Sequence, residues 1–206
     1  GVRHVTPSTD ELSRDGYRAN AGNRCYFCKA ELLDVITPIA RELGLAAVAT
    51  GTNADDAVAG FRPGIRAAAE RQAVTPLLDV GMTKADVRRA SRDWGLRTFD
   101  KPAAACLSSR IAYGIEITTG RLARVERAEA ALRSLFRSCG VPVRNLRVRD
   151  LGDCARVEVD AEHVDAVAAL PELPAVLSDF DAIEIDPRGF RSGAMNELLA
   201  DQERFR

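Results

Sequence analysis

The segment from residue 29 to residue 56 constrains the fold more than any other part of this sequence. Residues 29–43 carry apolar side chains at helical spacing, and Gly44 follows as a stop signal. The apolar run at residues 45–50 then has the length and composition of a buried parallel strand, and it leads into a polar loop, GTNADD, at residues 51–56. This order predicts an α/β domain with a ligand site at the carboxyl end of the strand. A plain turn rich in Gly, Asn and Asp has the same composition and is an equal alternative.

The composition is that of an ordinary globular protein. The chain has 206 residues, of which 46% are hydrophobic, so it has room for one large domain or two small ones. The formal net charge is −1, and no overall positive field favours nucleic acid. The sequence has no long apolar run and no signal-peptide core, so we expect a cytoplasmic protein with no membrane partner.

Three of the five cysteines lie in short motifs. Cys25 and Cys28 form a Cys-x-x-Cys pair, and Cys28 is predicted at a helix N-terminus, where the helix dipole favours the thiolate. Cys106 lies in the run KPAAACLSSR. Structural disulfides are rare in the cytoplasm, so metal binding or thiol chemistry is favoured. Three thiolates suit a [4Fe–4S] cluster with one open iron; zinc, or no metal, is the alternative.

Two local signals lie between these motifs. A capping box at Thr83 and Asp86 begins a helix that Gly95 ends. Residues 99–113 lack periodicity, and long irregular loops inside compact domains tend to carry function.

The second half of the chain has a different pattern, and we place the domain boundary near Ile117, between domains 1–117 and 118–206. The elements predicted after it are an amphipathic helix (122–136), two alternating strands (145–149 and 155–160), helical stretches (161–177) and an apolar strand (182–185). This order predicts a small α+β domain.

The two alternating strands are predicted to pair as a hairpin. One face of the hairpin carries Arg147, Arg149, Arg156 and Glu158. Guanidinium groups bind phosphate oxygens through paired hydrogen bonds, so this face is a candidate phosphate site. A solvated strand face has the same pattern and is the alternative.

Six motifs together resemble one family. In chain order they are NRCYFCK (23–29), GTNADD (51–56), FRPG (61–64), TPLL (75–78), KPAAACLSSR (101–110) and RSGAMNE (191–197). They span nearly the whole chain and are similar to the ATP-dependent sulfur transferases of nickel-pincer nucleotide synthesis, the LarE family.

The resemblance implies both a fold and a reaction. The fold is an α/β PP-loop ATP pyrophosphatase domain, a parallel sheet of the adenine-nucleotide α-hydrolase type, followed by a smaller α+β domain. The reaction adenylates a carboxylate of pyridinium-3,5-biscarboxylic acid mononucleotide and replaces it with a thiocarboxylate, for the cofactor of lactate racemase.

The resemblance also assigns residues. One branch of the family takes sulfur from its own cysteine at the position of Cys106, leaving dehydroalanine. Another branch has cysteines matching Cys25, Cys28 and Cys106, which look built to hold a [4Fe–4S] cluster carrying an extra sulfide. Because this chain has all three, we predict the cluster, with Cys106 as the catalytic residue, and keep sacrificial donation by Cys106 as the alternative. ATP with Mg²⁺ is expected at Gly51, Thr52, Asn53, Asp55, Asp56 and Lys101. The substrate and its phosphate are expected at Arg110, Arg147, Arg149, Glu158, Arg191 and Ser192.

One motif of the family is absent. Members carry Ser-Gly-Gly-x-Asp-Ser in the first strand-to-helix turn, where backbone amides hold the ATP phosphates. This sequence lacks it, and we expect about fifty to eighty residues to be missing before residue 1, the usual size of a βαβ beginning. Two other functions stay open: a PP-loop tRNA-thiolation enzyme, which the absence of a basic stripe disfavours, and a non-catalytic metal-binding module. We expect a homo-oligomer that binds no nucleic acid.

Overall fold

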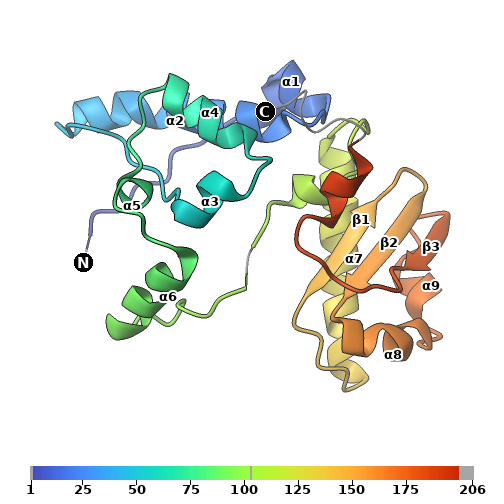
Figure 1. The fold of residues 1–206 in the computed structure, drawn as a ribbon. Helices are drawn as coiled ribbons and strands as arrows, with labels where there is room; N and C mark the ends of the chain where they lie inside the picture. The colour runs from blue at the N-terminus through green and yellow to red at the C-terminus, as the bar shows by residue number, and fades with distance from the viewer. Residues whose placement is uncertain (1, 103, 200–206) are drawn as a thin grey trace. The chain divides into compact units, whose positions relative to one another are not determined.

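The computed structural model describes residues 2–102 and 104–199, which form two compact units (Figure 1). Unit 1 contains the described residues 2–102, and unit 2 contains the described residues 104–199. Within these ranges, no helix combines the length and the apolar composition that crossing a membrane requires.

Unit 1 is built from helices. They are η1 (Glu11–Ser13), α1 (Asp15–Arg18), α2 (Arg24–Glu42), α3 (Ala54–Val58), α4 (Pro63–Glu70), α5 (Pro76–Asp79) and α6 (Lys84–Asp93). The capping box predicted at Thr83 and Asp86 is confirmed at the start of α6. α2 packs against α4, and the buried side chains of the pair include the apolar Ala30 and Leu33 and the charged Arg24.

The strand predicted at residues 45–50 is wrong. An isolated parallel bridge joins Ala49 to Val74, and the amide of Thr50 donates to the Val74 carbonyl at 2.9 Å. Leu45 is 57% exposed. An apolar run becomes a buried parallel strand only when strands pair with it and helices cover both faces. Over residues 2–102 the structure shows this bridge and no PP-loop parallel sheet.

Unit 2 contains a mixed three-stranded sheet in the order β1-β2-β3. Its elements are η2 (Leu107–Arg110), α7 (Thr119–Ser138), β1 (Leu146–Asp150), β2 (Cys154–Val159), η3 (Ala161–His163), α8 (Val164–Ala168), α9 (Leu173–Val176), β3 (Ala182–Ile185) and η4 (Ala194–Leu198). β1 and β2 are antiparallel, as the predicted hairpin requires, and β3 runs parallel to β2. The predicted α-β-β-α-β order is confirmed.

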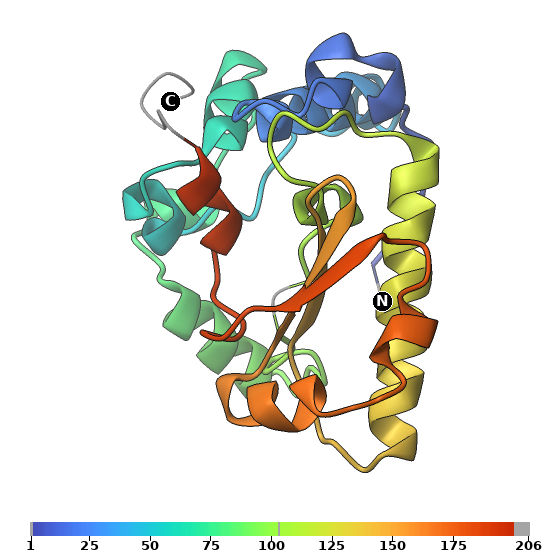
Figure 2. The same ribbon diagram turned by 90° about the vertical axis from the view of Figure 1, so that its right-hand side faces the viewer.

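The helix α7 covers one face of this sheet (Figure 2). The core between them consists of residues at helical spacing on α7 and at alternating positions on β1 and β2: Val125, Ala128, Leu132, Phe136, Leu146, Val148, Val157 and Val159. All eight are at most 3% exposed. The alternation places Arg147, Arg149, Arg156 and Glu158 on the opposite face. Asp150 has the parity of Leu146 and Val148, and on the α7 side it accepts from Arg124.

Residues after β3 cover part of that opposite face. The amide of Phe190 donates to the Val159 carbonyl at 2.6 Å, and the Phe190 ring lies 5.0 Å from the Arg147 guanidinium. Gly189 makes this approach possible: its φ is +66°, and a Cβ there would lie 2.8 Å from the Val159 carbonyl oxygen.

The boundary between the units differs from the predicted one near Ile117. Residues 104–117 belong to unit 2 because they pair with its sheet. Ile111 forms a parallel bridge with Asp150, and the amide of Ala112 donates to the Asp150 carbonyl at 2.9 Å. The sequence prediction placed the boundary where periodicity resumes, but an aperiodic segment can still be bound to a strand edge.

Candidate functional site

The Cys-x-x-Cys pair lies on α2, whose first helical residue is Arg24 rather than residue 29. Cys25 is therefore in the first turn, and Cys28 is in the second turn rather than at the N-terminus. Neither cysteine forms a disulfide; Cys25 is exposed and Cys28 is half-buried. Arg24, the first residue of the helix, is buried, and its Nη1 donates to Asn20 Oδ1 at 2.6 Å.

The predicted nucleotide residues at 51–56 build a local structure. The side-chain oxygen of Asn53 caps α3 by accepting from the Asp55 and Asp56 amides. In turn the Asn53 amide donates to the Asp56 carboxylate at 3.3 Å. Asp55 accepts from the Lys84 amide at 2.7 Å, at the start of α6. Gly51 is exposed and Thr52 is half-buried, with its hydroxyl 3.0 Å from that of Thr50. Lys101 is exposed near the end of unit 1.

Cys106 lies in unit 2, where it is an exposed free thiol that directly precedes η2. Two backbone carbonyls of its loop accept from one guanidinium: Arg110 Nη1 donates to Ala105 O at 2.7 Å and to Cys106 O at 2.9 Å. The Ser109 amide also donates to Cys106 O, at 3.0 Å. The backbone beside the thiol is therefore held at several points.

Arg110 is itself held by a buried carboxylate that the sequence analysis missed. Its Nε donates to Glu129 Oε1 at 2.9 Å, and the same oxygen accepts from the Val148 amide at 3.2 Å. Glu129 is 8% exposed. The signal for it was present in the sequence, because Glu129 lies four residues after Val125 on the buried side of an amphipathic helix.

The charged face of the hairpin is buried rather than solvated. Arg147, Arg149 and Glu158 are 7%, 5% and 1% exposed. Arg149 Nη2 donates to Glu158 Oε2 at 2.6 Å, and Arg149 Nη1 donates to Ser109 O at 3.1 Å. Arg156, the fourth predicted member of the face, is half-buried and pairs with Glu184 on β3.

This face is strongly positive. Burial, together with the nearby positive charge of Arg110, lowers the pKa of Arg147. Two guanidinium nitrogens, Nε of Arg149 and Nε of Arg191, are buried and have no hydrogen-bond partner. Leaving such a donor unsatisfied is costly, so these nitrogens indicate a place where an anion would be stabilised.

Arg191 and Ser192 lie in the segment that follows β3. Arg191 forms an ion pair with Glu197 and lies 3.9 Å from Asp186 Oδ2. The hydrogen bond from Arg191 lowers the pKa of the Glu197 carboxyl. Ser192 is exposed.

The structure thus brings the predicted substrate residues and Cys106 into one unit. A continuous set of contacts joins Cys106, Arg110, Arg149 and Glu158. Cys25 and Cys28 belong to unit 1. In residues 2–102 and 104–199, no three His, Cys, Asp or Glu side chains are arranged as a metal site.

The remaining two cysteines have different surroundings. Cys139 is exposed at the end of α7. Cys154 is half-buried at the start of β2, and burial, with the nearby Glu184 carboxylate, raises the pKa of its thiol. A raised pKa makes Cys154 a poor nucleophile near neutral pH.

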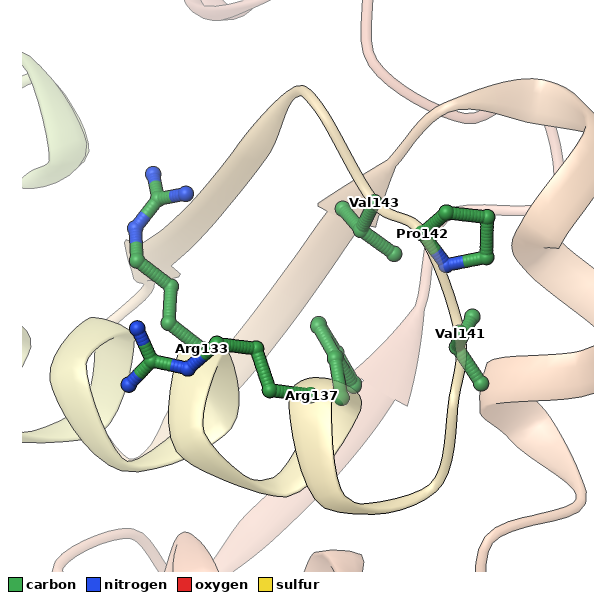
Figure 3. Close-up of a pocket in the computed structure, with 6 residues that line it drawn as sticks. Arg133, Arg137, Val141, Pro142 and Val143 are labelled. Carbon is green, nitrogen blue, oxygen red and sulfur yellow. The ribbon is translucent and has the colours of Figure 1, made fainter.

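A shallow hollow of about 190 Å³ lies at the end of α7 (Figure 3). Phe136 and the segment from Val141 to Val143 form its apolar wall, and Arg133 and Arg137 extend from α7 on the side away from Val141. None of the predicted site residues lines this hollow.

Comparison with known proteins gives the family. A pyridinium-3,5-bisthiocarboxylic acid mononucleotide synthase of Lactiplantibacillus plantarum is 34% identical over 193 residues, which cover 92% of this chain and 67% of that enzyme. The chain belongs to the LarE family. An uncharacterised Synechocystis protein is 40% identical over 204 residues, covering 97% of this chain and 74% of its own.

A more distant relative of this LarE-family chain comes from Methanocaldococcus jannaschii. This uncharacterised protein is 28% identical over 141 residues, covering 68% of this chain and 52% of its own length. No family model matches the chain.

Proposed function

We propose that this chain is an ATP-dependent sulfur transferase that converts pyridinium-3,5-biscarboxylic acid mononucleotide to its bisthiocarboxylic acid form. Membership of the family and the name of the Lactiplantibacillus relative support a sulfur-transferase role. The observation in this chain that carries the proposal is the pair of buried, unpartnered Nε–H donors of Arg149 and Arg191, in the unit that also holds Cys106.

The buried donors fit the phosphate of a mononucleotide. A guanidinium matches phosphate oxygens geometrically, and a hydrogen bond to a charged acceptor is about twice as strong as a neutral one. Arg149 keeps its Nε free while its other nitrogens bind Glu158 and Ser109. We therefore assign the phosphate of the substrate to Arg147, Arg149 and Arg191, with Glu158 fixing Arg149.

The chemistry requires an activated carboxylate. A carboxylate is a poor electrophile, and adenylation by ATP supplies a leaving group that a sulfur nucleophile can displace. We assign ATP with Mg²⁺ to residues 51–56 and Lys101. We further propose that the protein is cytoplasmic and homo-oligomeric, and that its partners are small molecules.

For the sulfur source we propose a [4Fe–4S] cluster. The proposal is supported by the presence of three cysteines, Cys25, Cys28 and Cys106, none of which forms a disulfide or is fully buried. Cys25 and Cys28 are three residues apart on α2, so both can face one centre. When bound, the cluster would supply a sulfide at an open iron, so that Cys106 would serve as a ligand without losing its own sulfur.

Metal analysis tests this source. Protein purified without oxygen should contain about four irons and at least four acid-labile sulfides per chain, with broad absorption near 400 nm. Cys25→Ala, Cys28→Ala and Cys106→Ala should each lose the iron, whereas Cys139→Ala should keep it. Iron retained in any of the first three variants would contradict the three-thiolate site.

Sacrificial donation by Cys106 is the second candidate, and the exposure of this cysteine favours it. In that case the protein would contain no iron, and after turnover the peptide that carries Cys106 would be lighter by one H₂S. Zinc alone would instead indicate a structural site. In either case the phosphate site on unit 2 would remain as proposed.

A further inference from the structure

Arg149 connects two parts of unit 2 that have separate roles in the proposed function. Its Nη1 donates to the Ser109 carbonyl at 3.1 Å, and its Nη2 donates to Glu158 at 2.6 Å. Its Nε is buried and without a hydrogen-bond partner. One rigid guanidinium thus donates to the Cys106 loop and to a buried carboxylate, and its Nε–H has no acceptor.

The Ser109 carbonyl belongs to the short helix η2, which directly follows Cys106. Within this turn the Ser109 amide donates to Cys106 O at 3.0 Å, and the Ile111 amide donates to Ser108 O at 3.2 Å. The Ser109 hydroxyl also donates to Cys106 O, at 2.7 Å. A displacement of the Ser109 peptide would therefore move the backbone of Cys106.

The geometry of a guanidinium makes its donors interdependent. The nitrogens lie in one plane with fixed angles, so an acceptor bound at Nε restricts the orientation of the whole group. Glu158, at 1% exposure, already fixes the Nη2 end. An anion at Nε would fix the plane from a second side and hold Nη1 on the Ser109 carbonyl.

We propose that Arg149 is a positioning residue that couples anion binding on the charged face to the order of the Cys106 loop, residues 106–110. A bound phosphate group accepts from Nε of Arg149, and the Nη1 bond to Ser109 then holds η2 and the Cys106 thiol in place. Substrate binding thus reduces the mobility of a loop whose hydrogen bonds are already formed without it. The inference rests on the proposed assignment of phosphate to this face.

Hydrogen exchange of the whole chain, with and without saturating inorganic phosphate, tests the coupling. Exchange of the Ser109 and Ile111 amides should slow by about fivefold on phosphate addition, the factor expected when about one net hydrogen bond is strengthened. Alkylation of Cys106 should slow in parallel, and alkylation of exposed Cys139 should not change. Sodium chloride at equal ionic strength is the control for screening.

Two variants separate coupling from charge. Arg149→Lys keeps the positive charge but has no planar fork. Phosphate should therefore still bind, with lower affinity, and the exchange rate of the Ser109 amide should no longer respond to it. Arg156→Gln removes the arginine opposite Arg149 in the β1–β2 register and should keep the response at saturating phosphate. The wild-type titration remains decisive if a variant fails to fold.

The outcomes distinguish failure of the coupling from failure of the proposed phosphate site. Phosphate binding, measured by calorimetry, with no change in Ser109 exchange would overturn the coupling and leave the proposed phosphate site intact. No phosphate binding by the wild-type chain would overturn both. An undiminished response in Arg149→Lys would show that another residue transmits the effect.

Discussion

Unit 1 and unit 2 place their charged groups differently. In unit 2 the carboxylates of Asp150 and Glu158 are buried, with side chains 0% and 2% exposed, and arginines donate to both. In unit 1 the ion pairs lie near the surface, as for Asp34, whose side chain is 42% exposed and pairs with Arg14 and Arg71. Buried carboxylates need fixed partners, and unit 2 has an interior network of arginines and carboxylates. In the described part of unit 1 the buried polar residues are Asn20, Arg24 and Asn53, and no carboxylate is buried.

The apolar residues of the two units differ in the same way. Unit 2 has one contiguous core between α7 and its sheet. The described part of unit 1 exposes several large apolar side chains, among them Val58 at 83%, Val80 at 74% and Trp94 at 78%. Stability in unit 2 should therefore come from long-range packing, and in unit 1 from helix caps and helix pairing.

The core of unit 2 should give the largest effect. Leu132→Ala removes a side chain that is 0% exposed, and we expect the free energy of unfolding of unit 2 to fall by about 4 kcal/mol. Amide exchange in β1 and β2 measures it. Leu45→Ala, at a site 57% exposed in unit 1, is the matched control and should change stability by less than about 0.5 kcal/mol. Equal losses of stability at the two sites would contradict the difference in packing between unit 1 and unit 2.

The buried carboxylate of Asp150 comes next. It accepts from Arg121 Nη1 at 2.9 Å, from Arg124 Nη2 at 2.6 Å and from the Gly152 amide at 3.0 Å. Asp150→Ala leaves two arginines without this acceptor, and we expect a loss of about 3 kcal/mol, measured by denaturant titration.

The control for Asp150 is a surface ion pair whose arginine, Arg127, also lies on α7. Asp179→Ala breaks a pair with Arg127 in which the side chains are 47% and 64% exposed, and the expected loss is below about 1 kcal/mol. A small effect at Asp150 would show that its network adds nothing to the stability of unit 2.

A helix cap in unit 1 should have a smaller and more local effect. Thr83→Ala removes the side chain that accepts from the Asp86 amide at the start of α6. We expect a loss of about 1 kcal/mol in the protection of α6 amides, with β1 and β2 amides unchanged. Loss of protection in β1 would contradict a local effect of the cap. Thr83→Ser, which keeps the hydroxyl, is the control.

The surface ion pairs of unit 1 should contribute least. Hydrogen bonds from Arg71 and Arg14 lower the pKa of Asp34, so its folded form binds a proton less readily than its unfolded form. The pair therefore stabilises unit 1 above the ordinary aspartate pKa, near pH 4, and the gain is lost as the pH falls through the lowered folded pKa.

Asp34→Asn should cost at most about 0.5 kcal/mol at pH 7, because the carboxylate is exposed, and less as the pH falls below the ordinary aspartate pKa. Thermal unfolding over a pH series measures it. A cost that does not change with pH would mean that the side chain acts through packing and not through its charge.

The sequence predicted those elements whose pattern is local. The hairpin, α7 and the capping box at Thr83 each depend on residues close together in the chain, and each is confirmed. The strand at residues 45–50 could not be decided locally, because a parallel strand exists only through partners distant in sequence.

The sequence offers candidate residues for the site but does not describe their environment. The sequence pattern of the arginine face is the same whether that face is solvated or covered. The segment that covers it, around Phe190, is distant in the chain. The link from Arg149 to Ser109 likewise joins residues 40 apart in sequence. Whether the charges of this strand face are buried therefore depends on contacts between residues distant in the chain.

The parallel pairing of β3 with β2 implies an order of events during folding. The β1–β2 hairpin closes through a short turn, whereas β3 joins only after the crossover of residues 160–181 has formed, and longer loops close more slowly. Arg149 and Glu158 both lie on the hairpin, so we expect them to meet while water still reaches them. Dehydration of the pair would then be the last step, when Gly189 and Phe190 dock on β2, and pulse-labelled exchange during refolding would resolve the two stages.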